Sequence, residues 1–201
     1  MSRQRLVSGG AEANERLTSS TGLILLVLLA VEGVTVLQVR SLLRMHVFVG
    51  VLLIPPVMVK LSSTVYRFLR YYQGTPDYRL KGPPHWLLRV LGPGVVVLTV
   101  VLLASGVGLM FVGPAWHGRF LLVHKASFFL WFAAMTVHVL GHLGESGRLG
   151  LPDWMPGRRV AGAGSRRSAV MASLVVGAGA GLLILSRVGP YLGNLPSRLG
   201  R

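Results

Sequence analysis

Three histidines lie within an apolar stretch of the chain that is long enough to cross a lipid bilayer. The stretch runs from Phe120 to Leu143 and contains His124, His138 and His142. Ionisable side chains are costly inside a membrane, so their presence there indicates a function. His124 and His138 are fourteen residues apart, which on a helix is a rise of about 21 Å with the two side chains within about 40° of one face. One helix would therefore offer an imidazole in each half of the membrane, where the second axial ligands of two stacked haems would lie.

A fourth histidine, His46, begins another apolar segment and is the expected partner of His124. In a chain that crosses the membrane five times, the second and fourth spans run in the same direction, so both residues fall in the outer half. Two imidazoles at matched depth on parallel helices are what bis-histidine ligation of haem b requires. Either histidine alone would more simply be a buried polar group bonded to a carbonyl oxygen, but the matched pair favours haem. Gly50, one turn after His46, would leave space for the flat macrocycle.

Charged side chains at and within the spans suggest further cofactor contacts. Arg44, Arg119 and Lys125 lie near the outer ends of the spans, where they could pair with haem propionates. Within the membrane, Glu32 is expected either to be bonded to a neighbouring helix or to contact a proton or a quinol near the redox centre. Lys60, deeper in the second span, is more plausible as a snorkelling or propionate-pairing group than as an iron ligand.

The inner half offers His138 and His142 on one helix face, with no histidine at that depth in another span. His85, just before the third span, could complete a second haem with either of them, or could be an interfacial residue. The pair could instead form half of a zinc or copper site, although Val139 stands where the glutamate of the zinc-protease pattern belongs. His117, which falls in a predicted loop, is expected at the surface.

The composition indicates a polytopic membrane protein. Of the 201 residues, 52% are apolar and only 13% are charged, which is atypical of a soluble domain. The chain has no cysteine, which excludes disulfides, thiolate-held iron–sulfur clusters and covalent c-type haem. The net charge of +15 is explained by basic residues that flank the spans, and we expect no nucleic-acid partner.

The hydropathy pattern predicts an all-α fold with five transmembrane helices and no strand. A tail over residues 1–20 precedes a four-helix bundle over 21–143, which is the expected haem-binding unit. A loop rich in Gly, Pro and Arg follows over 144–167, then a fifth helix over 168–187 and a tail over 188–201. The individual spans are predicted at about Thr21–Val39, Met45–Tyr66, Leu91–Val112, Phe120–Leu143 and Ser168–Ser186.

The distribution of Lys and Arg predicts the orientation. With Lys60 left inside the membrane, thirteen basic residues fall on the side of the N-terminus and seven on the opposite side. The positive-inside rule therefore places the N-terminus in the cytoplasm and the chain in the plasma (inner) membrane of a bacterium as a multi-pass protein.

Several segments resemble the bacterial cytochrome b561-like family, which includes the cytochrome b subunits of formate dehydrogenases and nickel–iron hydrogenases. They are RMHVFVG, KLSSTVYRFLRYY, KGPP and HKASFFLWF with HVLGH, between Val39 and Leu143. In that family, helix four carries two histidines fourteen apart, here His124 and His138, and helix two supplies the partner for the outer haem, here His46. Helix one of the family supplies the inner partner, whereas the first span of this chain has no histidine.

The resemblance implies a b-type cytochrome that passes electrons between a quinone/quinol pool and a redox partner, as the electron-transfer subunit of an oxidoreductase or of a larger membrane complex. The alternative is a non-catalytic transmembrane subunit without haem. It would bind its partner complex through the fifth helix, where small residues repeat every four positions. A transporter is disfavoured because there is no inverted repeat and few polar residues could line a path. The small residues are Ser173, Gly177 and Gly181.

Overall fold

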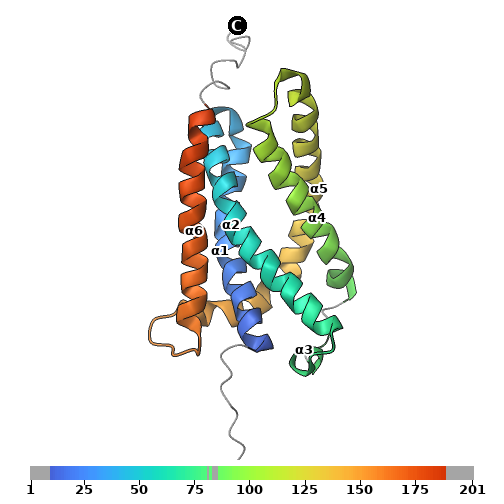
Figure 1. Cartoon of the computed structure of the whole chain (residues 1–201), viewed down its shortest axis with the longest axis vertical. Helices are drawn as coiled ribbons and strands as arrows, with labels where there is room; N and C mark the ends of the chain where they lie inside the picture. Colours follow the sequence, from blue (N-terminus) through green and yellow to red (C-terminus); the bar gives the residue numbers. More distant parts are fainter. Residues whose placement is uncertain (1–9, 81, 83–85, 189–201) are drawn as a thin grey trace, which may run out of the picture.

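The computed structural model describes residues 10–80, 82 and 86–188, and these residues form helices and connecting turns without a strand (Figure 1). Three short segments accompany the long helices: α3 and two 3₁₀ turns, Leu151–Asp153 and Leu185–Arg187. The α-helices are α1 (Ala11–Leu37), α2 (Val39–Tyr72), α3 (Pro76–Leu80), α4 (Trp86–Leu109), α5 (Pro114–Gly150) and α6 (Ala163–Ile184).

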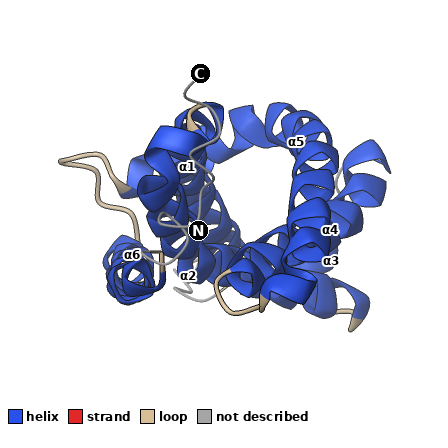
Figure 2. Ribbon diagram, turned by 90° about the horizontal axis from the view of Figure 1, so that it is seen from above, coloured by secondary structure: helices blue, strands red, loops and turns tan. Residues whose placement is uncertain are grey.

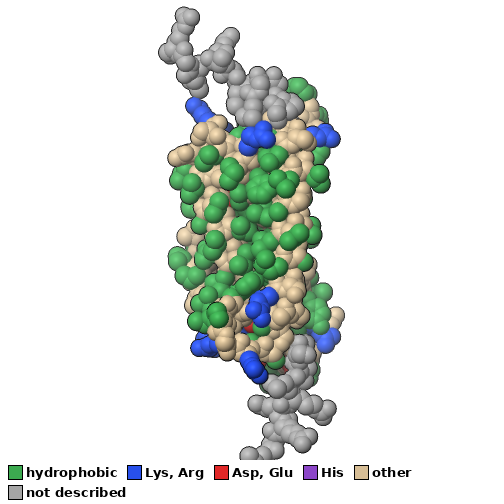
Figure 3. All heavy atoms as spheres, turned by 90° about the vertical axis from the view of Figure 1, so that its left-hand side faces the viewer, with side chains coloured by type: hydrophobic (Ala, Val, Ile, Leu, Met, Phe, Trp, Pro, Cys, Tyr) green, Lys and Arg blue, Asp and Glu red, His purple; other side chains and the backbone are tan. Residues whose placement is uncertain are grey.

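Five of these helices, α1, α2, α4, α5 and α6, are long and apolar enough to cross a membrane. Large apolar side chains point outward along them, for example Leu183 of α6, which is 79% exposed. Over the face that contains α6, apolar side chains cover the middle and Lys and Arg side chains gather towards the two ends (Figure 3). By length and composition the chain is therefore a multi-pass membrane protein, as predicted.

The long helices run between two ends of the molecule, which we name from Figure 1. The lower end holds the start of α1 and the end of α2, and the upper end holds the junction of α1 and α2 at Gln38 and the α4–α5 turn at Gly113. Seen from above, α1, α2, α4 and α5 surround a common centre, and α6 lies outside them (Figure 2). Within this arrangement α1 packs on α2 and α5, α4 packs on α5, and α6 packs on α2.

The helices extend beyond the apolar stretches that predicted them. α5 begins at Pro114, where proline at the first helical position needs no backbone N–H partner, so His117 lies in the helix and not in a loop. The same helix continues to Gly150, seven residues into the predicted loop over 144–167. α1 likewise begins at Ala11, within the predicted tail. The predicted boundaries were wrong here because hydropathy marks the membrane and not the end of the backbone hydrogen bonds.

The small residues of α6 pack against α2 of the same chain. A Cβ atom on Gly177 would lie 2.5 Å from the carbonyl oxygen of Leu52, and one on Gly181 would lie 2.8 Å from Cδ2 of Phe48. Ser173 is also buried on this side. Glycine is therefore required for the close approach of the two helices. The small residues that suggested a partner-binding helix therefore form a contact between α6 and α2 of the same chain.

A buried ion pair connects three segments at the lower end. Arg166 of α6 donates two hydrogen bonds to the carboxylate of Asp153, at 2.6 and 2.7 Å. Ser20 of α1 donates a third to Asp153 at 3.1 Å. Both charged side chains are almost fully buried. We call Ser20, Asp153 and Arg166 the lower clasp, because together they join α1 and α6 to the turn after α5.

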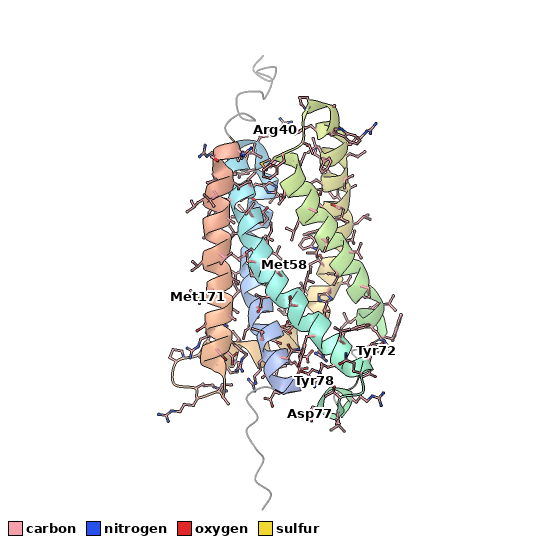
Figure 4. All side chains as sticks on the ribbon, in the orientation of Figure 1. Arg40, Met58, Tyr72, Asp77, Tyr78 and Met171 are labelled. Carbon is pink, nitrogen blue, oxygen red and sulfur yellow. The ribbon has the colours of Figure 1, made fainter. Side chains whose placement is uncertain are left out.

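Aromatic side chains also mark the lower end. The rings of Phe68 and Tyr72 lie 4.5 Å apart, and Tyr72 accepts a hydrogen bond of 2.8 Å from Arg89 of α4. In Figure 4, Tyr72 and Tyr78 lie at this end and Arg40 at the opposite one, while Met171 lies on the outer side of α6. Tyrosine and arginine at helix ends are typical of the headgroup level of a membrane.

Candidate functional site

His46 of α2 and His124 of α5 lie next to each other in the upper half of the molecule. Their ring centroids are 6.2 Å apart and their planes are inclined by 71°. We call these two residues the upper histidine pair. The sequence predicted that these two side chains would meet, and the structure brings them together from two different helices.

Glu32 of α1 fixes the imidazole of His46. Nδ1 of His46 lies 2.8 Å from Oε1 of Glu32, and Thr35 donates a hydrogen bond of 2.9 Å to the other carboxylate oxygen. The side chains of His46 and Glu32 are only 20% and 14% exposed. A carboxylate at Nδ1 keeps the proton of the ring on that nitrogen. Nε2 is then unprotonated and is the nitrogen that could bind a metal.

A backbone carbonyl, which carries no charge, orients the imidazole of His124. Its Nδ1 lies 3.1 Å from the carbonyl oxygen of Leu102 in α4, and the hydroxyl of Ser105 is 3.3 Å away. Ser105 in turn donates to the Leu102 carbonyl at 3.0 Å. Gly106 leaves room for the ring, since a Cβ atom there would lie 3.0 Å from Cε1 of His124. This imidazole is also oriented through Nδ1, which leaves Nε2 as its second nitrogen.

The separation of the His46 and His124 rings suits a metal centre that takes only two ligands from the protein. If each ring bonds a metal at about 2.0–2.1 Å, the two centroids are separated by roughly 6 Å, close to the separation in the structure. Among the described residues, no group of three or more His, Asp or Glu side chains could hold a metal ion alone. Two imidazoles at this separation without a third protein ligand are compatible with haem iron, whose other four ligands are in the macrocycle.

The other residues that were predicted to contact the haem do not form the Nδ1 contacts of the upper histidine pair. A Cβ atom on Gly50 would be 3.5 Å from Oε1 of Glu32, an ordinary van der Waals contact, so the carboxylate lies beside this glycine without requiring it. Arg44 and Lys125 are exposed. Arg119 is exposed as well and lies over the ring of Trp116, 4.9 Å from its centroid. It borders a surface hollow of about 350 Å³. The hollow is lined by Val101, Ala104, Ser105, Trp116, Arg119, Phe120 and Val123.

His138 and His142, the lower histidine pair, are neighbours on one helix. Their ring centroids are 4.8 Å apart. Nδ1 of His138 is buried and, within the described part of the chain, has no hydrogen-bond partner. Nδ1 of His142 is 3.6 Å from a carboxylate oxygen of Glu145, a loose contact. Residues at i and i+4 approach from the same side, so these two cannot be the opposed axial ligands of one iron. His85, the expected partner, lies outside the described residues, and the second haem stays a prediction.

Lys60 is held at the lower end by α1. Its ammonium donates a hydrogen bond of 3.1 Å to the carbonyl oxygen of Thr18. A Cβ atom on Gly22 would lie 2.9 Å from this ammonium, so the lysine side chain crosses α1 at a glycine. Thr18 also shares a hydrogen bond of 2.7 Å with Ser63 of α2. The predicted snorkelling lysine instead connects two helices.

Sequence reasoning missed the groups that orient the two imidazoles. Thr35, Leu102 and Ser105 were not selected, Gly106 was selected only as a position of close helix approach, and the contact of Glu32 with His46 was not predicted. A usable signal existed for two of them: Thr35 is three residues after Glu32, which places both side chains on one face of α1, and Ser105–Gly106 is a polar and small pair in an apolar helix.

The chain matches no protein-family model, no curated protein and no solved structure among those with which it was compared.

Proposed function

We propose that the chain is a membrane b-type cytochrome that holds one haem b between His46 and His124. The bundle of α1, α2, α4 and α5 would enclose the haem, with α6 packed at its side. The observation that carries this proposal is the pair of adjacent imidazoles from two helices, each bonded through Nδ1 to a group on a neighbouring helix. An isolated buried histidine would need only its own hydrogen bond and no neighbouring ring.

The residues of the chain bind and orient the cofactor and keep water away from it. His46 and His124 would hold the haem iron through their second ring nitrogens, and Glu32 and the Leu102 carbonyl would keep the proton of each ring on Nδ1. A bound haem supplies a reversible one-electron change of its iron. Among the described residues, the polar side chains that contact the two rings are Glu32, Thr35 and Ser105. A site whose polar groups orient the imidazoles in this way suits electron transfer better than catalysis of bond cleavage.

Electrons would pass through this centre between a quinol in the lipid and a redox partner protein. Arg44, Arg119 and Lys125 are placed at the upper rim, where they could pair with the haem propionates. The excess of basic residues on the side of the lower end supports a cytoplasmic position of that end and of the N-terminus. The haem would then lie in the outer half of the plasma membrane.

The proposal is tested by the colour of the purified chain. The protein is expressed in cells that make haem, extracted in detergent, and its haem is counted against protein by the pyridine haemochrome method. We expect a low-spin b-type reduced-minus-oxidised spectrum and at least one haem per chain. A colourless preparation that also takes up no added haemin would contradict the proposal. Metal analysis of the same sample would reveal zinc or copper held instead.

A further inference from the structure

The two imidazoles of the upper histidine pair are oriented by chemically unlike groups. The acceptor at Nδ1 of His46 is the carboxylate of Glu32, and the acceptor at Nδ1 of His124 is a peptide carbonyl. Both acceptors fix the tautomer and the direction of the ring. Only the carboxylate also brings a full negative charge next to the site. Orientation alone therefore does not explain why one of the two groups is Glu32.

The Glu32 carboxylate contacts His46 and Thr35, and the Thr35 hydroxyl also lies 2.7 Å from the backbone carbonyl of Glu32. One oxygen lies 2.8 Å from His46, and the other accepts from the hydroxyl of Thr35 at 2.9 Å. Thr35 itself is buried, and Gly50 lies next to the carboxylate. Among the described residues, no lysine or arginine forms an ion pair with Glu32. The ion-pair partner of the Glu32 carboxylate among the described residues is His46 itself.

We propose that Glu32 is a positioning residue that sets the reduction potential of the haem through His46; this rests on the proposed function. A carboxylate that accepts the Nδ1 proton makes the imidazole a more electron-rich ligand. Reduction adds one electron to the iron, Fe(III) to Fe(II), and removes one unit of positive charge. A fixed negative charge in a medium of low dielectric constant stabilises the ferric form more than the ferrous form. Glu32 therefore lowers the potential and makes the reduced centre a stronger electron donor.

The test uses Glu32→Gln, which keeps an oxygen that can accept from Nδ1 and removes only the charge. The midpoint potential is measured by spectroscopic titration with dithionite in the presence of redox mediators. We expect the ratio of ferrous to ferric haem at a fixed ambient potential to rise by about tenfold or more, which for a one-electron couple corresponds to about 59 mV. The low-spin ferric signals in electron paramagnetic resonance should shift as well, because the ligand becomes less electron-rich.

Two control variants separate charge from local disturbance. Glu32→Asp keeps the charge and should restore a potential close to that of the wild type. Glu12→Gln removes a carboxylate that is exposed at the lower end, where it pairs with Arg16 at 2.9 Å, and should leave the potential unchanged. A Glu32→Gln protein that retains haem with the wild-type potential would overturn the inference while the proposed function stands. A wild-type protein without haem would instead overturn the proposed function.

A measurement on the wild-type protein keeps the inference testable if Glu32→Gln folds poorly. The reduced-minus-oxidised infrared spectrum is recorded with and without ¹³C-labelled glutamate. We expect an ionised carboxylate band that moves on reduction and is shifted by the label, because Glu32 is bonded to an axial ligand. A difference spectrum without any label-sensitive carboxylate band would overturn the inference.

Discussion

The upper and lower histidine pairs contain the same side chain twice, yet their surroundings differ. His46 and His124 come from two helices, lie next to each other, and have both Nδ1 atoms fixed. His138 and His142 come from one helix, lie one above the other, and leave a buried Nδ1 of His138 without a partner among the described residues. The difference shows that the number of histidines in a helix does not determine a site. The neighbouring helices, which supply the second ring and the acceptors, determine it.

The two ends also differ in how they are held together. At the lower end, Lys60 is bonded to α1 and the lower clasp joins α1 and α6 to the turn after α5. In the upper half, polar groups surround the adjacent imidazoles. We therefore expect substitutions at the lower end to affect mainly the stability of the fold, and those in the upper half to affect mainly haem binding.

The largest stability effect is expected in the lower clasp. Asp153→Leu leaves the buried Arg166 without its partner, and such a change typically costs about 3–5 kcal/mol. The double variant Asp153→Leu/Arg166→Leu removes both charges and should recover much of this loss. Thermal unfolding of the protein in detergent measures both effects. Folded protein should keep the wild-type haem spectrum; a spectrum lost together with the clasp would show that the two ends are not separate in function.

A smaller effect is expected where α6 packs on α2. Gly177→Val places side-chain atoms against the backbone of Leu52, which cannot move aside easily, and should cost about 1–3 kcal/mol. Gly179→Val is the matched control, because a Cβ atom at Gly179 has no neighbour within 4 Å. The same unfolding assay measures both variants. Equal stability of the two would show that α6 is not packed through Gly177.

The smallest effect is expected beside the upper pair, at Gly106. Gly106→Ala places a methyl group 3.0 Å from the His124 ring, and a displacement of the ring would cost roughly 1 kcal/mol, or about fivefold in haem affinity. Gly94→Ala on the same helix, with no neighbour within 4 Å, should bind haem as the wild type does. Haemin titration of the haem-depleted proteins measures the affinities. Equal affinities would mean that the ring of His124 is not held against Gly106.

Much of the fold could be predicted from the sequence, because an apolar run of sufficient length has few alternatives to a membrane helix. The ends of the helices could not, since α5 begins and ends outside its apolar stretch. His46 and His124 were predictable because depth and direction follow from the order of the spans. The contact of Glu32 with His46 was not, because it depends on how α1 is rotated about its own axis, which packing against α2 and α5 decides.

The most direct test of the account is the haem content of four single variants measured side by side. His46→Ala, His124→Ala, His138→Ala and His142→Ala are purified in parallel with the wild type, and their low-spin b-type spectra are scaled to protein. We predict that His46→Ala and His124→Ala each lose the same spectral component completely, and that His138→Ala and His142→Ala keep it. The account would be contradicted if either His46→Ala or His124→Ala retained that component in full.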